Sequence, residues 1–385
     1  MGKTAIILLV SQQTIPNVIF LKWFFKNNMQ TNVDIIFVST HKMEVDEKSD
    51  CIKNATNFML IKFISSFNTI IVNENNMQQI QSELKKYFTK HSYQNVIANI
   101  TGGTKLMSIA AYDFFKNLAN SEIYYQPIND DLQKLNPTKE MYEVKELVTL
   151  DEYFKAYGIK TEYKNKCLFS FEVNKNIYKI IEKNKDVVNA LRACRNSDYF
   201  KKKTKGGKLA NFNELDEEQF TKVIKNGVSK KEICDLFSEF KFDSNAVSGE
   251  QIDYIIGGWF EEFVFQKIQK EQNIPNDKIA INVKIKKGET EQELDVVYID
   301  TKNKLHVIEC KSYVDGNKGS DVLSNALYKI QAIIKSGFGL SAKSHLYTMS
   351  VVNKKSALNR AKDFNITLVD RTSLLSNEDK EFVDG

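Results

Sequence analysis

Short apolar runs alternate with stretches of helical spacing through the first third of the chain. The runs have the length of buried parallel strands, and they fall at residues 4–10, 33–38, 69–72, 95–100 and 122–126. Between them, apolar residues three and four apart predict helices over residues 16–25, 51–65, 78–87 and 104–118. This alternation predicts a doubly wound, Rossmann-like α/β sheet of parallel strands.

Polar loops follow the predicted strands, at residues 11–14, 39–41, 73–75 and 99–107. In a doubly wound sheet, ligands bind beyond the carboxyl ends of the strands, where these loops meet. The last loop, Asn-Ile-Thr-Gly-Gly-Thr-Lys-Leu-Met, leads straight into a helix, so flexible glycines and helix N–H groups meet Lys105 at an anion site. Its spacing is neither that of a P-loop nor that of a dinucleotide-binding loop. The alternative is a glycine turn with a threonine cap.

A second pattern lies at residues 293–311, where two runs rich in Val, Ile and Leu flank a polar loop at residues 300–304. This pattern predicts a β-hairpin with a short connection. If the loop is symmetric, Asp295 faces Glu309 and Glu293 faces Lys311. All four side chains then lie on one face of the sheet, because side chains alternate along a strand.

Directly opposed carboxylates have Cβ atoms about 5 Å apart and repel each other unless a cation lies between them. Asp295 and Glu309 therefore indicate a hard divalent cation, Mn2+ or Mg2+, to which the carbonyl of Cys310 adds an oxygen. Lys311 points to the same side and can hold an attacking water or stabilise the charge on a pentacovalent phosphate. The alternative is a surface hairpin with charged ends.

These residues resemble the PD-(D/E)xK nuclease superfamily, the restriction-endonuclease-like fold, with Asp295, Glu309 and Lys311 at the motif positions. The departure is that no Pro precedes Asp295. The resemblance implies that a Glu on the first helix completes the metal shell. Helical spacing over residues 255–265 places Glu261 at the edge of the buried side and Glu262 farther towards water. We therefore assign Glu261 to the metal. One alternative is that Glu262 is the metal ligand instead. The other is that Glu261 is an ordinary glutamate at the solvent edge of the helix.

The loop at residues 99–107 resembles the (T/N)-GG-T-K-x-M segment of the CRISPR-associated Rossmann fold, or CARF, domain. In that family this segment and the loop after the first strand hold a cyclic oligoadenylate across a two-fold dimer interface. The resemblance implies a homodimer, because an isologous interface presents the same loop twice to a two-fold symmetric ring such as cyclic tetra-adenylate. The loop residues assigned to the ligand are Ser11, Gln12, Gln13, Thr14, Thr40, Asn99, Thr101, Gly102, Gly103, Thr104, Lys105 and Met107.

Composition excludes some functions and permits others. The five cysteines have no CxxC spacing and the four histidines are dispersed, which disfavours zinc sites, disulfides and histidine-based triads and fits a cytoplasmic protein. No run reaches the roughly 18 apolar residues of a membrane span. The net charge of +5 permits a nucleic-acid partner without requiring one.

The length of 385 residues allows two or three domains. We expect a CARF sensor domain over residues 1–147, a connection over residues 148–175, and a nuclease domain with a helical first part over residues 176–385. Further expectations are a turn at residues 132–142, one amphipathic helix at 177–193, and strands of a mixed sheet at 279–285, 346–352 and 366–369. The basic run at residues 201–208 is either a mobile phosphate contact or a solvated lysine loop.

Along nearly the full chain, the two motif blocks resemble the ancillary nucleases of type III CRISPR systems that have one CARF and one nuclease domain. The resemblance implies activation by a cyclic oligoadenylate and manganese- or magnesium-dependent cutting of single-stranded RNA, single-stranded DNA or nicked supercoiled DNA. No base-reading element is visible, so we expect weak sequence preference. Two other functions stay open, a ligand-responsive nucleic-acid-binding regulator without catalysis and an unregulated repair or restriction nuclease.

Overall fold

The computed structural model describes residues 2–28, 31–128, 131–145, 147–163, 165–195, 197–203, 209–211, 216–224, 227–243, 246–313 and 319–374. The chain forms two compact units. The first comprises Met1–Lys164, Ile274–Val307 and Lys329–Ser344, and the second comprises Asn165–Asn273, Ile308–Tyr328 and His345–Gly385. None of the helices in the described part of the chain combines the length and the apolar character that a bilayer crossing requires.

Seven strands form the N-terminal sheet, in the order β3-β2-β1-β4-β5-β6-β7. They span Thr4–Leu9 (β1), Val33–Ser39 (β2), Ile64–Ile71 (β3), Asn95–Asn99 (β4), Ser121–Tyr125 (β5), Leu132–Asn136 (β6) and Glu140–Tyr142 (β7). Strands β1 to β5 pair in parallel, which confirms the predicted doubly wound sheet. The prediction of a turn at residues 132–142 was wrong, because β6 and β7 add two antiparallel strands there. Both strands are short, with β7 at the edge of the sheet and β6 next to it, and Leu132 is their one buried apolar residue, so their alternation is weak.

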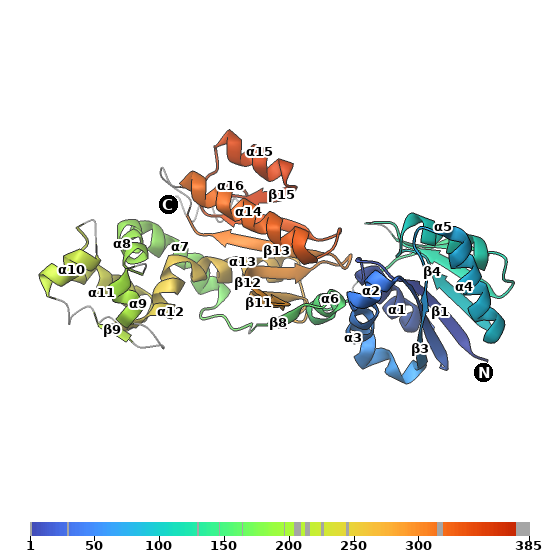
Figure 1. Ribbon diagram of the computed structural model, residues 1–385. Helices are drawn as coiled ribbons and strands as arrows, with labels where there is room; N and C mark the ends of the chain where they lie inside the picture. Colours follow the sequence, from blue (N-terminus) through green and yellow to red (C-terminus); the bar gives the residue numbers. More distant parts are fainter. Residues whose placement is uncertain are drawn as a thin grey trace. The chain divides into compact units, whose positions relative to one another are not determined.

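Helices cover both faces of this sheet. They are α1 (Ile15–Asn27), α2 (His41–Val45), α3 (Lys48–Leu60), α4 (Met77–Lys90) and α5 (Lys105–Phe115), and a 3-10 turn spans Ile61–Phe63. Alternate residues of β1 join different clusters: Ile6 packs in the cluster that includes Val18 of α1, and Ile7 in the one that includes Ile80 of α4. Figure 1 shows α4 and α5 together on one side of the sheet. This two-sided burial explains why β1 is an apolar run from Ala5 to Leu9.

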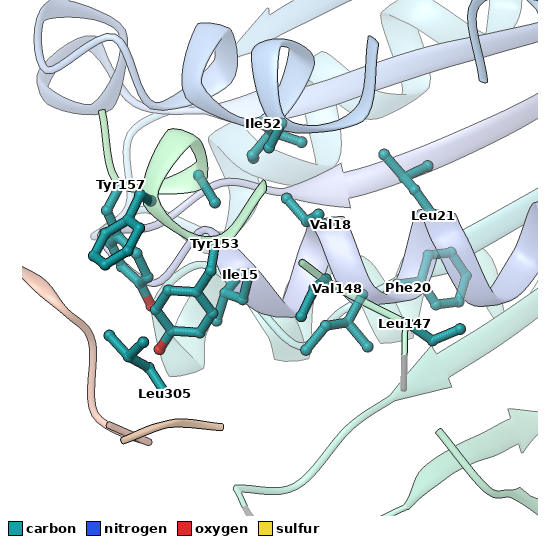
Figure 2. Close-up of a cluster of buried hydrophobic side chains, with 14 of the residues drawn as sticks. Ile15, Val18, Phe20, Leu21, Ile52, Leu147, Val148, Tyr153, Tyr157 and Leu305 are labelled. Atoms are coloured by element: carbon teal, nitrogen blue, oxygen red, sulfur yellow. The ribbon is translucent and has the colours of Figure 1, made fainter. Parts of the chain in front are cut away.

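The first unit continues through α6 (Leu150–Ala156), which begins with a capping box formed by Thr149 and Glu152. Figure 2 shows the rings of Tyr153 and Tyr157 beside Leu305 in a buried cluster. Tyr153 is fully buried, and its hydroxyl donates to the carbonyl of Phe338 at 2.9 Å. Segments from distant parts of the sequence therefore share one core in this unit.

Six strands form the second sheet, in the order β15-β14-β13-β12-β11-β8. They span Lys160–Glu162 (β8), Ile279–Lys287 (β11), Thr290–Ile299 (β12), Leu305–Lys311 (β13), Lys343–Thr348 (β14) and Ile366–Val369 (β15). The mixed sheet expected for a restriction-endonuclease-like domain is thereby confirmed. Strand β8, which falls in the predicted connection, pairs antiparallel with β11.

The remaining elements are mostly helices. They are α7 (Phe171–Lys183), α8 (Lys185–Arg195), α9 (Asp198–Lys203), α10 (Glu217–Val223), α11 (Lys230–Glu239), α12 (Gly249–Asp253), α13 (Trp259–Glu271), α14 (Gly319–Gly337), α15 (Lys355–Asp363) and α16 (Arg371–Leu374), together with the short strands β9 (Leu209–Asn211) and β10 (Ala246–Ser248). The single helix predicted at residues 177–193 is two helices. Asn184 ends α7, and its side-chain amide donates to the carbonyl of Ile180 at 2.8 Å, a local bond that competes with helix continuation.

Candidate ligand pocket and candidate active site

The loop between β4 and α5 lies very close to β1. A Cβ atom on Gly102 would come within 2.0 Å of the carbonyl oxygen of Leu9, so only glycine fits there. Gly103 has a φ of +74°, which also favours glycine. Thr104 caps α5 by accepting the N–H of Met107, and Lys105 is the exposed first residue of the helix. The loop therefore presents a helix N-terminus and a lysine side by side, an arrangement that suits an anion.

A chain of hydrogen bonds fixes the carboxyl ends of three neighbouring strands. The buried Asn17 donates to the carbonyl of Leu9 at 2.9 Å and accepts from Asn99 at 2.9 Å. Asn99 in turn accepts from the hydroxyl of Thr101 at 2.6 Å, and that hydroxyl accepts the N–H of Gln126 at 2.9 Å. Because the side chains of Asn17, Asn99 and Thr101 are all hydrogen-bonded in this network, the loops are held in one arrangement before any ligand binds.

A cavity of about 450 Å³ lies at these strand ends, within the first unit. It brings together five of the residues assigned to the ligand from the sequence: Ser11, Gln13, Thr101, Gly103 and Lys105. The rest of its lining was not predicted, and comprises Ile15, Pro16, Ile19, Tyr125, Gln126, Pro127, Ile128, Asp131, Val144, Lys145, Lys302, Asn303, Lys304, Leu340 and Ser341. Four lysines and one aspartate give the lining an excess of positive charge, which suits a polyanionic ligand.

The other residues assigned to the ligand do not line this cavity; they are Gln12, Thr14, Thr40, Asn99, Gly102, Thr104 and Met107. Several have structural roles. The hydroxyl of Thr14 is buried and donates to the carbonyl of Ala156, Thr40 caps α2, and Met107 is part of the core. The amide of Gln12 donates to Asp46 at 2.6 Å.

The turn of the predicted catalytic hairpin forms part of the cavity lining. Asp300 donates its N–H to the carbonyl of Lys304 at 3.0 Å, and Asn303 has a φ of 62°, which closes a short loop. The buried side chain of Asn303 donates to the carbonyl of Val144 at 2.9 Å and accepts the N–H of Leu147 at 2.7 Å. These bonds hold the turn against the segment that follows β7, with residues 302–304 at the cavity.

Two observations define the hairpin register near the turn. The Asp300 to Lys304 bond pairs those residues, and the rings of Tyr298 and His306 stack with centroids 4.3 Å apart. If the ladder continues without a bulge, Asp295 of β12 lies opposite Glu309 of β13, as the sequence predicts. That pairing stays a prediction.

The end of β13 has the charges that a cation site needs. Glu309 is 3% exposed and Asp295 of β12 is 9% exposed, so neither carboxylate is well solvated. The ammonium of Lys311 lies 2.7 Å from Oε1 of Glu309 and 3.0 Å from the carbonyl oxygen of Cys310. A cationic group therefore already lies against the two oxygens that the sequence assigns to a metal. These oxygen donors fit Mn2+ or Mg2+.

Over the residues that the structure describes, no group of three or more His, Cys, Asp and Glu side chains is arranged to hold a metal. Glu261 is half-buried on the first turn of α13, and its place in a metal shell stays a prediction. Of the basic run at residues 201–208, positions 204–208 lie outside the described residues.

Glu262, which the sequence placed towards water, is 6% exposed, so that expectation was wrong. Its carboxylate accepts the N–H groups of Leu168 and Phe169, the amide of Asn174, and the hydroxyl of Tyr254 at 2.9 Å. Burial, with the nearby Glu262 charge, raises the pKa of Tyr254 well above its usual range, so its hydroxyl remains a donor. A helical wheel could not anticipate this burial, because the donors come from a segment distant in sequence.

Two family models match the chain. The Card1 CARF domain model matches residues 5–153, and the Card1-like endonuclease domain model matches residues 248–380. The chain combines a Card1 CARF domain with a Card1-like endonuclease domain. The cavity at the strand ends contains mostly residues of the CARF domain, together with the hairpin turn of the endonuclease domain.

Solved structures share this fold. Can2 from Sulfobacillus thermosulfidooxidans in complex with cyclic tetra-adenylate has a TM-score of 0.69 and 20% identity, over 99% of this chain and 97% of its own. Protein VC1899 from Vibrio cholerae has a TM-score of 0.70 and 19% identity with the same coverage. A type III CRISPR defence DNA nuclease activated by cyclic oligoadenylate has a TM-score of 0.51 and 12% identity, over 95% of this chain and 48% of its own. A search of curated proteins gave no match.

We expect mutations of the two neighbouring acids of α13, Glu261 and Glu262, to affect stability differently. Glu262→Ala removes a buried carboxylate that accepts four hydrogen bonds, two of them from the side chains of Asn174 and Tyr254, and we expect the free energy of unfolding to fall by about 3 kcal/mol. Glu261→Ala, the matched control on the same helical turn, should change it by less than about 1 kcal/mol. Urea unfolding followed by circular dichroism measures both. Equal effects of the two substitutions would contradict the structural role of Glu262.

Some of the unpredicted cavity residues could have been found from the sequence. Tyr125 and Gln126 stand at the carboxyl end of β5, where the strand-end rule already places ligand loops. Lys302 and Lys304 could not have been found from the sequence, because their loop has the pattern of an ordinary hairpin turn. Nothing in the local sequence connects that loop to the CARF domain.

Proposed function

We propose that the chain is a homodimeric nuclease of type III CRISPR defence that a cyclic oligoadenylate activates, with cyclic tetra-adenylate as the activator. It cuts single-stranded RNA or single-stranded DNA with weak sequence preference and depends on Mn2+ or Mg2+. One observation carries the proposal: the turn of the hairpin that bears Asp295 and Glu309 lines the same basic cavity as Lys105 of the CARF loop. The hairpin therefore contributes its turn to the pocket that would receive the signal and its strands to the site that would do the chemistry.

The activator would bind with its phosphates near the basic groups of the cavity, at the N-terminus of α5 and the lysines that surround it. A cavity of about 450 Å³ is within the range for one drug-sized ligand, and a ring of four nucleotides is larger than that. Two copies of the cavity related by a two-fold axis would match the two-fold symmetry of the ring. This relation supports a homodimer as the form that binds the activator.

In the endonuclease domain, Asp295, Glu309 and the carbonyl of Cys310 would hold the metal, with Glu261 as a further candidate. When bound, Mn2+ or Mg2+ supplies Lewis-acid stabilisation of the phosphodiester and lowers the pKa of a coordinated water. Lys311 has a role of its own. Its ammonium, now on Glu309 and Cys310, can turn towards the phosphate and stabilise the negative charge that develops on its oxygens.

Activation would follow from the shared turn. A ligand in the cavity contacts Lys302 or Lys304 and thereby favours one position of the hairpin loop. Asp300 and Asn303 tie that loop to its own strands and to the CARF side, so a preferred loop position restricts the strands that continue to Asp295 and Glu309. A ligand drives such a switch only if it binds one arrangement of the hairpin more tightly than the other, because this difference in binding free energy shifts the equilibrium.

Neutralising the turn should impair activation more than catalysis. For Lys302→Gln with Lys304→Gln, we expect the half-maximal concentration of cyclic tetra-adenylate to rise about tenfold or more, with little change in maximal rate, because charge-assisted contacts to phosphate are lost. Lys284→Gln is the matched control, since Lys284 is exposed on β11 and does not line the cavity. An unchanged activation curve would contradict the role given to the turn.

The metal requirement has a direct test. Treatment with EDTA should abolish cleavage, and either Mn2+ or Mg2+ should restore it, whereas binding of cyclic tetra-adenylate measured by calorimetry should persist in EDTA. Cleavage that continues in EDTA would contradict a metal-dependent mechanism.

A further inference from the structure

A second, smaller cavity lies in the second unit, beside α8. Its volume is about 90 Å³, and it is lined by Ile181, Lys185, Val188, Asn189, Arg192 and Tyr313. Two apolar side chains form one part of the lining, and two cations, an amide and a phenol form the rest. A cavity of this size, roughly that of three waters at about 30 Å³ each, suits a phosphate group and is too small for a nucleoside.

Neighbouring groups hold Arg192 in place. Its guanidinium donates to the carbonyl of Ile256 at 3.3 Å and to Oδ1 of Asn189 at 3.2 Å. Burial lowers the pKa of Arg192, and a guanidinium keeps its charge under such a shift. A pre-positioned arginine with planar donors is well suited to bind phosphate oxygens.

The carbonyl of Ile256 also connects this cavity to the motif strand. It accepts the hydroxyl of Ser312 at 2.9 Å, and Ser312 directly follows Lys311 at the end of β13. Ile256 belongs to a π-helical turn, Tyr254–Gly258, which leads into α13. Such turns often occur at functional sites. Arg192 and the residue after the motif lysine therefore donate to a single backbone oxygen.

Tyr313 directly follows Ser312 in the sequence, and several charged groups lie near its side chain. The ammonium of Lys185 lies 5.0 Å from the centroid of its ring, and its hydroxyl donates to Glu182 at 2.7 Å. Glu182 also pairs with Lys185 at 3.3 Å, so an anion in the cavity would compete with one carboxylate. Arg371 is near enough for its charge to act on the Tyr313 hydroxyl. Two cations, Lys185 and Arg371, thus lie near Tyr313, against the single carboxylate of Glu182.

We propose that Lys185, Asn189 and Arg192 of α8, together with Tyr313, form a phosphate-binding notch that holds the backbone of the nucleic-acid substrate beside the end of β13. The inference rests on the proposed nuclease function. The notch binds a phosphate next to the one that is cut and so positions the strand against Lys311. It contacts the backbone only, so it reads no sequence, in agreement with weak specificity.

The test uses the full-length protein with Arg192→Gln and Lys185→Gln. The matched controls are Arg195→Gln and Lys183→Gln. Arg195 is the last residue of α8 and pairs with Asp253 of α12, and Lys183 is an exposed lysine outside the notch. Binding of fluorescein-labelled single-stranded RNA and DNA of mixed sequence is followed by anisotropy in EDTA with cyclic tetra-adenylate, over a salt series. Cleavage in Mn2+ then gives KM and kcat.

We expect each notch substitution to weaken binding and raise KM about tenfold, to leave kcat within about threefold, and to reduce the slope of log K against log salt by about 0.7. Arg192→Lys should restore most of the salt slope. Unchanged binding, KM and slope in both notch variants, or equal losses in the controls, would overturn the notch. If Arg192→Gln fails to fold, the Lys185→Gln result decides. A chain that binds strands through the notch and cuts none would refute the proposed function and leave the notch intact.

Discussion

Asp295→Asn should reduce cleavage by about 1000-fold or more while leaving activator binding unchanged. The carboxylate is buried, so its loss removes the proposed metal ligand at a place where solvent cannot replace it, and a metal-derived stabilisation of several kcal/mol corresponds to this factor. Glu309→Gln should have an effect of similar size. Single-turnover cleavage in Mn2+ with saturating cyclic tetra-adenylate measures the rate.

The control for Asp295→Asn is Glu291→Gln on the same strand. Glu291 is exposed and pairs with Lys286 at 3.1 Å, so its loss should change the rate by less than about threefold. If Asp295→Asn and Glu309→Gln both cut at the wild-type rate, the site proposed at the hairpin is wrong. Activator binding by calorimetry shows whether each variant keeps a working CARF domain.

Lys105→Gln should raise the concentration of cyclic tetra-adenylate needed for activation by about 10- to 100-fold. Lys105 is the exposed first residue of α5 and lines the cavity, where its charge adds to that of the helix N-terminus. In a homodimer both copies lose the contact, which favours the upper end of this range. Calorimetric titration of the activator gives the affinity, and activator-dependent cleavage gives the functional effect.

Lys116→Gln is the matched control, because Lys116 lies at the other end of the same helix and pairs with Asp113 at 2.7 Å. It should leave affinity and activation unchanged. Equal affinity of the wild type and Lys105→Gln would mean that the loop after β4 is a structural turn capped by Thr104, the alternative that the sequence left open.

Local pattern was sufficient for most of the fold. Central strands of a parallel sheet are rich in apolar residues, so β1, β2, β4 and β5 could be located within a residue or two. The short strands β6, β7 and β8 were missed because they lie at or near sheet edges and depend on pairing with a neighbour for their stability. The break at Asn184 was missed because one polar residue interrupts an otherwise regular amphipathic pattern.

The candidate sites, like the fold, could be predicted from the sequence only where the signal is local. The loop at residues 99–107 and the two strands of the hairpin have local signatures, so Lys105, Asp295, Glu309 and Lys311 could be singled out from spacing and chemistry. The contact of residues 302–304 with the cavity and the burial of Glu262 depend on segments brought together by folding. No periodicity in the chain encodes those contacts, and they required the structure.

A cleavage assay shows directly whether the chain is a nuclease controlled by its CARF ligand. Labelled single- and double-stranded RNA and DNA are incubated with the full-length chain in Mn2+, with and without cyclic tetra-adenylate. We expect cleavage of a single-stranded substrate that requires both the metal and the activator. Cleavage that is the same with and without the activator would contradict this expectation.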